Sequence, residues 1–101
     1  VTENGAAFYD PPALDGGHLS DPHRLAYFKS HIRAVHQALQ QGVDLRGYFA
    51  WSLMDNLEWS LGFAKRFGLV HVNFETLQRT PKDSALFYAE LIAANGRLLA
   101  D

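Results

Sequence analysis

The sequence predicts an α/β fold in which parallel strands alternate with amphipathic helices. Three observations carry this prediction. Apolar residues recur at helical spacing in two separate segments, an almost continuous apolar run lies between these segments, and a short β-branched stretch opens the chain. The predicted order is therefore strand, helix, strand, helix. This is the order of two consecutive βα units, with a right-handed crossover between the strands.

Composition indicates a globular chain and narrows the range of partners. The chain has 101 residues, of which 48% are hydrophobic and 20% are charged. A net charge of −2 gives no reason to expect nucleic acid or an anionic membrane as a partner. No apolar run reaches the roughly 20 residues that span a bilayer. Without cysteine, neither a disulfide nor a thiolate metal site can form, and none of this fixes a compartment.

The first predicted strand is short and is followed by a long loop. Val1 and Thr2 read as the end of a β-branched strand, which Glu3-Asn4-Gly5 interrupts. Because the chain opens inside a strand and without an initiator methionine, we expect it to belong to a longer polypeptide. Two prolines and two glycines between residues 11 and 17 predict a surface loop over residues 6–20.

The first helix is predicted to begin at Asp21. This residue suits the N-cap, and Pro22 suits the first turn, where a missing N–H costs nothing. Gly42 supplies the stop. The apolar residues that recur at steps of three and four are Leu25, Phe28, Ile32, Val35 and Leu39.

The second strand is predicted in the run that begins at Gly47 and reads Gly-Tyr-Phe-Ala-Trp-Ser-Leu. Such a run suits a strand buried on both faces, as in a parallel sheet. Residues 54–65 are expected to form a connection, and residues 67–74 a short extended excursion. The second helix is predicted to begin at Thr80-Pro81-Lys82-Asp83 and to end near Gly96. Its apolar positions are Leu86, Phe87, Leu91 and Ile92.

Two βα units are a poor free-standing domain. A parallel sheet needs cover on both faces and neighbours on both edges. We therefore expect residues 1–101 to be the C-terminal part of a single (β/α)8 TIM-barrel domain, whose whole length is about 250 residues or more. The two units are expected to be incomplete on their own and to need the remaining barrel segment as a partner.

Two groups of residues are candidates for chemistry. Glu3 follows a predicted parallel strand, where barrel enzymes keep catalytic groups. A glutamate before Asn-Gly is, however, also a common solvated turn residue. The second group follows the next strand and comprises Trp51, Asp55, Asn56, Glu58 and Trp59. Indole faces stack on sugar rings, and carboxylates accept hydrogen bonds from paired hydroxyls. The alternative for this group is a core tryptophan next to a charged loop.

Four segments, in order, resemble glycoside hydrolase family 1. Val1-Thr2-Glu3-Asn4-Gly5 resembles the nucleophile motif, and Gly47-Tyr-Phe-Ala-Trp-Ser-Leu-Met-Asp-Asn-Leu-Glu-Trp59 resembles the last-strand segment. Arg66-Phe-Gly-Leu-Val70 and Arg79-Thr-Pro-Lys-Asp-Ser84 match the C-terminal stretch. Between them, the helix has fitting residues at Asp21, Arg24, Tyr27 and His31. The resemblance covers essentially the whole chain and implies a retaining β-glucosidase.

The resemblance implies a role for each site residue. Glu3 would be the nucleophile that attacks the anomeric carbon and forms a covalent glycosyl-enzyme. Trp51 would donate a hydrogen bond to a sugar hydroxyl, and Glu58 would accept from hydroxyls at the far side of the ring. Trp59 would lie beside the sugar, and Phe67 would wall the subsite near its hydroxymethyl group. The implied substrate is a β-linked glucoside, with β-galactosides or β-fucosides as companions, and no cofactor or metal is implied.

The second carboxylate of a retaining mechanism is not found in the chain. The family carries it in an Asn-Glu-Pro segment on an earlier strand, and no Asn-Glu-Pro occurs here. We therefore expect the chain alone to be inactive. Two alternatives stay open: a remnant that binds sugar without turnover, and a purely structural barrel fragment. Asp21 and Arg24, and the two adjacent cations Lys65 and Arg66, are interpreted as members of surface or structural ion pairs rather than as substrate ligands.

Overall fold

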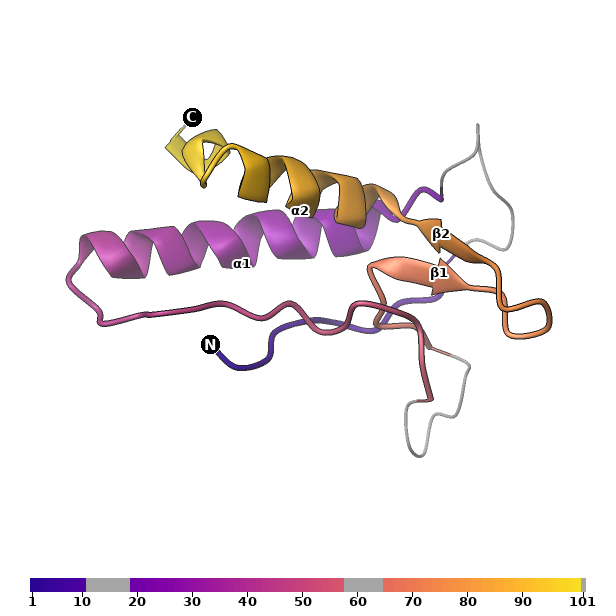
Figure 1. The fold of residues 1–101 in the computed structure, drawn as a ribbon. Helices are drawn as coiled ribbons and strands as arrows, with labels where there is room; N and C mark the ends of the chain where they lie inside the picture. Colours follow the sequence, from indigo (N-terminus) through magenta and orange to yellow (C-terminus); the bar gives the residue numbers. More distant parts are fainter. Residues whose placement is uncertain (11–18, 58–64, 101) are drawn as a thin grey trace.

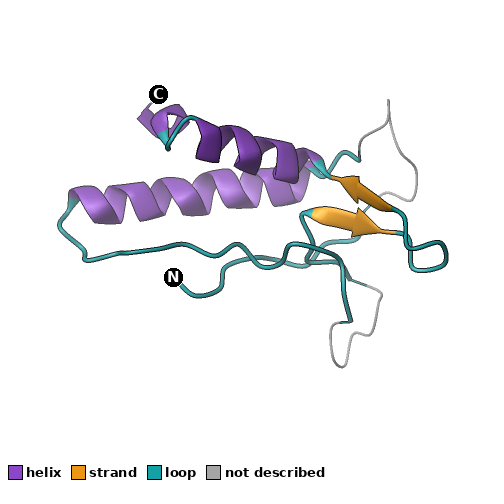
Figure 2. Cartoon of the chain, viewed as in Figure 1, coloured by secondary structure: helices purple, strands orange, loops and turns teal. Residues whose placement is uncertain are grey.

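The computed structural model describes residues 1–10, 19–57 and 65–100 (Figure 1). The α/β class is confirmed, because two helices lie side by side and two strands lie beside their first turns. Extended segments 1–10 and 43–57 form a second layer along helix α1 (Figure 2). The elements are α1 (Pro22–Gln40), β1 (Val70–Val72), β2 (Arg79–Pro81), α2 (Asp83–Ala93) and the 3₁₀ helix η2 (Arg97–Ala100).

Helix α1 confirms the first predicted helix, but Asp21 acts differently from the prediction. Gly42 follows the helix with a φ of 89°, a conformation that glycine adopts without strain. Asp21 occupies the N-cap position, yet its side chain makes no capping hydrogen bond. Its carboxylate instead accepts from the backbone N–H of Ser84 at 2.9 Å and from Arg24 at 2.9 Å. The predicted N-cap position is therefore confirmed, but its side-chain hydrogen bond is not formed, because this carboxylate joins the start of α1 to the start of α2.

The apolar core lies between the two helices and the segment that leads into β1. Its buried members are Phe28 and Ile32 of α1, Leu69, and Leu91 of α2. Removal of these side chains from water holds the helices together. The rest of the predicted apolar positions are less covered: Leu39 is 46% exposed, Leu86 48% and Ile92 62%.

The segment after Gly47 departs from the predicted buried strand in two respects. The segment is extended, but it makes isolated parallel bridges, Asn4 with Ala50 and Met54 with Val70, rather than a continuous ladder. It is also not buried on both faces, since Phe49 is 66% and Leu53 67% exposed. Segment 47–51 pairs with segment 1–4 along one edge. Within the described residues, no further layer covers the side chains of Phe49 and Leu53.

Strand β1 falls inside the extended excursion predicted for residues 67–74, whereas strand β2 was not predicted. The two strands pair antiparallel, with Val70 opposite Pro81 and Val72 opposite Arg79. Because β2 takes up Thr80 and Pro81, helix α2 begins only at Asp83. The predicted stop near Gly96 is confirmed by its φ of 78°. No helix in the described part of the chain is both long and apolar enough to cross a membrane.

Candidate active site

The segment that carries Glu3 lies in parallel register beside the segment that carries Trp51. The N–H of Asn4 donates to the carbonyl of Phe49 at 3.0 Å, and the N–H of Trp51 donates to the carbonyl of Asn4 at 2.7 Å. The N–H of Phe49 donates to the carbonyl of Val1 at 3.1 Å. Glu3 and Trp51 therefore stand on neighbouring segments, close to the bridge between Asn4 and Ala50.

Gly5 allows these two segments to approach each other closely. A Cβ atom built on Gly5 would overlap the carbonyl oxygen of Trp51. Any side chain at this position would therefore push the two segments apart. The short distance between the Glu3 segment and Trp51 depends on this glycine.

Glu3 and Asn4 point to opposite faces of their segment. The Asn4 side chain bonds to the hydroxyl of Tyr27 on α1, so it faces the helix. Successive side chains of an extended chain alternate between faces, so Glu3 points away from α1. Glu3 is exposed, and Trp51 is 40% exposed. The carboxylate and the indole ring are both accessible to a ligand.

Phe67 lies on a third segment, next to the residue that follows Trp51. The N–H of Ser52 donates to the carbonyl of Phe67 at 3.1 Å, and the carbonyl of Ser52 accepts from Leu69 at 2.8 Å. The peptide bond between Trp51 and Ser52 is cis. Three of the predicted site residues thus lie on three adjacent segments. The other two, Glu58 and Trp59, lie outside the described residues.

Asp55, which the sequence groups with the sugar-binding cluster, is buried at 5% exposure. Its Oδ1 accepts from Lys82 Nζ at 2.8 Å and from the N–H of Gly68 at 3.1 Å, and its Oδ2 accepts from Arg66 Nη1 at 2.6 Å. Burial raises the pKa of Asp55, but the hydrogen bonds from Lys82 and Arg66 outweigh burial and lower that pKa below its ordinary value. Asp55 is therefore an ionised structural group rather than a sugar ligand.

The ion pairs of Asp55 continue into a buried charge cluster, which alternates three carboxylates with three cations. Lys82 Nζ also donates to Asp10 at 2.6 Å, and Arg24 donates to Asp10 at 2.8 Å and to Asp21 at 2.9 Å. The members of the cluster are Asp10, Asp21, Asp55, Arg24, Arg66 and Lys82. The Asp21–Arg24 pair was interpreted as a surface or a structural ion pair. It is buried, so it is a structural pair.

One feature of the sequence indicates this cluster, namely the position of Arg24. Arg24 stands four residues before Phe28 and eight before Ile32, so it lies on the apolar face of α1. Its side chain is fully buried. An arginine on the apolar face of a helix requires acidic partners, which here are Asp10 and Asp21.

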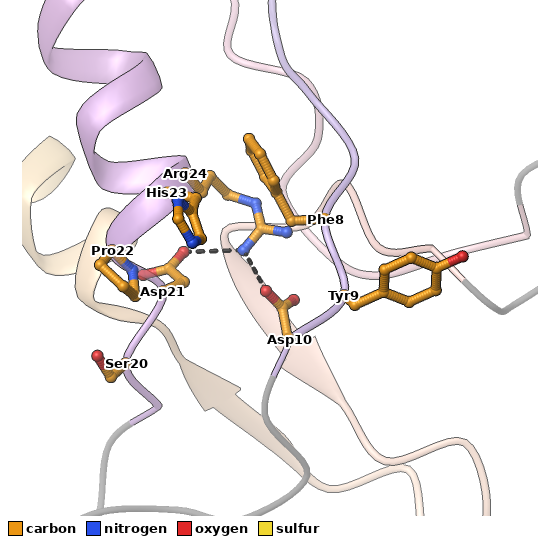
Figure 3. A pocket seen from close by; sticks show the side chains of 8 residues that line it. All are labelled: Phe8, Tyr9, Asp10, Ser20, Asp21, Pro22, His23 and Arg24. Carbon is orange, nitrogen blue, oxygen red and sulfur yellow. Dashed lines mark hydrogen bonds and ion pairs between the residues drawn. The ribbon is translucent and has the colours of Figure 1, made fainter.

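A cavity of about 330 Å³ lies beside this cluster (Figure 3). Its lining residues are Phe8, Tyr9, Asp10, Ser20, Asp21, Pro22, His23 and Arg24. Figure 3 shows the guanidinium of Arg24 between the carboxylates of Asp10 and Asp21, with the ring of Tyr9 turned away from them. Of the predicted site residues that the structure describes, Glu3, Trp51 and Phe67, none lines this cavity. Among the described residues, no group of three or more histidine or acidic side chains is arranged to hold a metal ion.

Comparison with known proteins gives the chain its family. Residues 1–97 match the model of glycosyl hydrolase family 1. The β-glucosidase A of Acetivibrio thermocellus is 49% identical over 96 residues, which cover 95% of this chain and 21% of that protein. The bifunctional β-D-glucosidase/β-D-fucosidase of Bifidobacterium breve is 48% identical, with 92% of this chain and 21% of that protein covered.

A solved structure agrees with the sequence matches. The family 1 β-glucosidase from Thermotoga maritima superposes with a TM-score of 0.90 at 48% identity, over 95% of this chain and 22% of that chain. The chain spans about a fifth of the length of the relatives that it matches. The resemblance indicated by the four motifs is confirmed, and the chain belongs to glycosyl hydrolase family 1.

Proposed function

We propose that this chain supplies the nucleophile and much of the glycone subsite of a retaining β-glycosidase. The observation that carries the proposal is the exposed carboxylate of Glu3, held in parallel register beside the accessible indole of Trp51. The proposed substrates are β-glucosides. The names of two relatives, a β-glucosidase and a bifunctional β-D-glucosidase/β-D-fucosidase, support β-glucosides and suggest β-fucosides as companions. A β-galactoside remains a further candidate.

In the proposed mechanism, the ionised carboxylate of Glu3 attacks the anomeric carbon. The bond to the leaving group breaks, and the leaving oxygen takes a proton from a second carboxylic acid. Water then attacks the glycosyl-enzyme, loses its proton to that same carboxylate and releases Glu3, so the configuration is retained. The second carboxylate must stand about 5–5.5 Å from Glu3. We assign it to the rest of the barrel, because no Asn-Glu-Pro occurs in this chain.

The proposed sugar contacts come from four aromatic or acidic residues. Trp51 donates from its indole N–H to a hydroxyl of the sugar, and Phe67 walls the subsite near the hydroxymethyl group. Glu58 is proposed to accept hydrogen bonds from hydroxyls at the far side of the sugar ring, and Trp59 is proposed to lie beside the sugar. A carboxylate that accepts from two hydroxyls can accommodate either epimer at one of them, which is consistent with activity on more than one glycone.

We propose further that residues 1–101 are the C-terminal part of a single (β/α)8 barrel and contain its last two βα units. The TM-score of 0.90 over about a fifth of a family 1 chain supports this assignment. The exposure of Phe49, Leu53 and Ile92 also supports it, because these side chains leave an apolar surface for the rest of a barrel to cover. The chain alone is then a sugar-binding or structural unit without turnover.

The test uses two samples, the 101-residue chain alone and the completed barrel. The completed barrel is this chain joined to the rest of a family 1 enzyme, for which the A. thermocellus β-glucosidase A with its matching segment replaced can serve. Each sample is incubated with an activated 2-deoxy-2-fluoro-β-glucoside, which traps a glycosyl-enzyme, and is then analysed by intact-mass and peptide mass spectrometry. One adduct on Glu3 in the completed barrel, and none on the chain alone, is expected.

In the completed barrel, Glu3→Gln removes the attacking carboxylate and should lower kcat for an activated β-glucoside by about three orders of magnitude or more. Glu90→Gln is the matched control, because Glu90 is an exposed glutamate on α2. Near-normal hydrolysis by Glu3→Gln, or an adduct on another residue, would refute the assignment of the nucleophile.

A further inference from the structure

Asn4, the residue after Glu3, is held through both its side chain and its main chain. The hydroxyl of Tyr48 donates to Asn4 Oδ1 at 2.6 Å, and Asn4 Nδ2 donates to the hydroxyl of Tyr27 at 3.1 Å. The main chain of Asn4 bonds to Phe49 at 3.0 Å and to Trp51 at 2.7 Å. The amide cannot rotate without the loss of both tyrosine bonds in a half-buried place.

The two tyrosines that hold Asn4 are themselves fixed by packing. The ring of Tyr27 stacks on His31, with 3.8 Å between centroids, and meets the ring of Phe28 edge-on at 5.6 Å. The ring of Tyr48 packs against the apolar core and lies 6.4 Å from that of Tyr88. Burial raises the pKa of Tyr48, so its hydroxyl stays protonated and able to donate. The amide of Asn4 is thus attached to a rigid part of the molecule.

We infer that Tyr48 and Tyr27 are positioning residues for the nucleophile Glu3 and act through the side chain of Asn4. The inference rests on the proposed function of Glu3. Because the side chain of Asn4 is turned toward α1, the side chain of the preceding residue must point to the opposite face. The two hydroxyls thereby set the direction of the Glu3 carboxylate relative to Trp51 without contact with the substrate.

The expected effect follows from the geometry of nucleophilic attack. The attacking and attacked atoms must be held about 3–3.5 Å apart, and a displacement of about 1 Å can lower the rate by about a hundredfold. Removal of one of the two tyrosine bonds leaves the other in place. We therefore expect the rate of attack by Glu3 to fall on the order of tenfold when either hydroxyl is removed.

The experiment compares Tyr48→Phe and Tyr27→Phe with a matched control, Tyr88→Phe, in the completed barrel. Tyr88 is a half-buried tyrosine of the same core that packs near Tyr48. The measurement is covalent labelling of Glu3 by the fluoroglucoside, with the maximal rate constant and the dissociation constant of the reagent determined separately. The maximal rate constant should fall in the two test variants, with the dissociation constant unchanged, while the control matches the parent.

A double-mutant cycle separates positioning through Asn4 from a loss of folding. Tyr48→Phe should lower the labelling rate in the parent but cause no further fall in an Asn4→Ala background, because the link is already broken. If Tyr48→Phe does not fold, Tyr27→Phe carries the same test through the other bond. A rate in both variants equal to that of Tyr88→Phe, or a full further fall in the Asn4→Ala background, would overturn the inference.

The same data keep this inference distinct from the proposed function. If the parent completed barrel is not labelled on Glu3, the proposed function itself fails. If the parent is labelled, and both tyrosine variants are labelled at the rate of the parent, only the positioning role fails.

Discussion

Glu3 and Asp55 each follow an extended segment, and their surroundings differ in kind. Asp55 is buried, and both of its oxygens accept bonds from cations and backbone N–H groups. Glu3 is exposed, on a segment that the backbone of residues 47–51 and the side chain of Asn4 hold in place. The carboxylate of Asp55 therefore stabilises the fold through its hydrogen bonds and ion pairs. The carboxylate of Glu3 stays accessible to a ligand, and only the residues around it are held in place.

This difference determines how each region responds to substitution. In the buried charge cluster, the loss of one partner leaves a buried charge without compensation, so the cost falls on stability. At the face that carries Glu3, the backbone register fixes the geometry, so under the proposed function the cost falls on turnover by the completed barrel.

Lys82→Met should produce the largest loss of stability. Lys82 Nζ donates to Asp10 at 2.6 Å, to Asp55 at 2.8 Å and to the carbonyl of Gly68 at 2.6 Å, all in a buried place. Methionine preserves the volume but leaves two carboxylates without a shared cation. We expect a loss of about 3–5 kcal/mol in the free energy of unfolding. Urea denaturation of the completed barrel measures it.

Arg46→Met is the control for this prediction. Arg46 pairs with Asp44 at 2.8 Å, but the two side chains are 84% and 74% exposed. Exposed ion pairs contribute little to stability, so the unfolding midpoint should not move measurably. Equal effects of the two substitutions on the free energy of unfolding would show that burial does not determine how much the Lys82 contacts contribute to stability.

Sequence patterns predict the local parts of this structure and miss the long-range ones. The spacing of Phe28 and Ile32 is a local property, so α1 was predicted correctly. Strand β2 was missed because Thr80-Pro81-Lys82 also reads as a helix start, and only its pairing with β1 makes it a strand. The two cations that pair with Asp55, Lys82 and Arg66, stand 27 and 11 residues away along the chain. No local pattern could therefore separate the role of Asp55 from that of a sugar ligand.

Gly5→Ala should have the next largest effect, on turnover. The added Cβ would overlap the carbonyl oxygen of Trp51 and push the Glu3 segment away from Trp51. A displacement of about 1 Å predicts a fall of about a hundredfold in kcat for an activated β-glucoside. Gly47→Ala is the matched control, because a Cβ there would meet only a ring atom of Phe49 at 3.9 Å. Equal kcat values for the two variants would show that close approach at Gly5 is not required.

Protonation of Asp55 should lower the stability in acid, and this is the smallest of the three effects. The pKa of Asp55 in the folded protein is lowered from its ordinary value of 3.8, so folding favours its ionised form. Its contribution to stability is therefore fully present above about pH 4–5 and is lost as the pH falls through 3.8 toward the folded pKa. Asp55→Asn keeps the shape of the side chain and removes this titration.

The measurement is the free energy of unfolding of the completed barrel, from pH 6 down to pH 3, with and without this substitution. Asp44→Asn is the control, because the side chain of Asp44 is 74% exposed. It measures how the loss of one surface carboxylate changes the free energy of unfolding. The gap between the parent and Asp55→Asn should be widest near pH 6 and should narrow as the pH falls below about 4. A gap of constant size would mean that protonation of Asp55 is not what destabilises the buried charge cluster in acid. The comparison between Asp55 and Glu3 would then rest on packing rather than on charge.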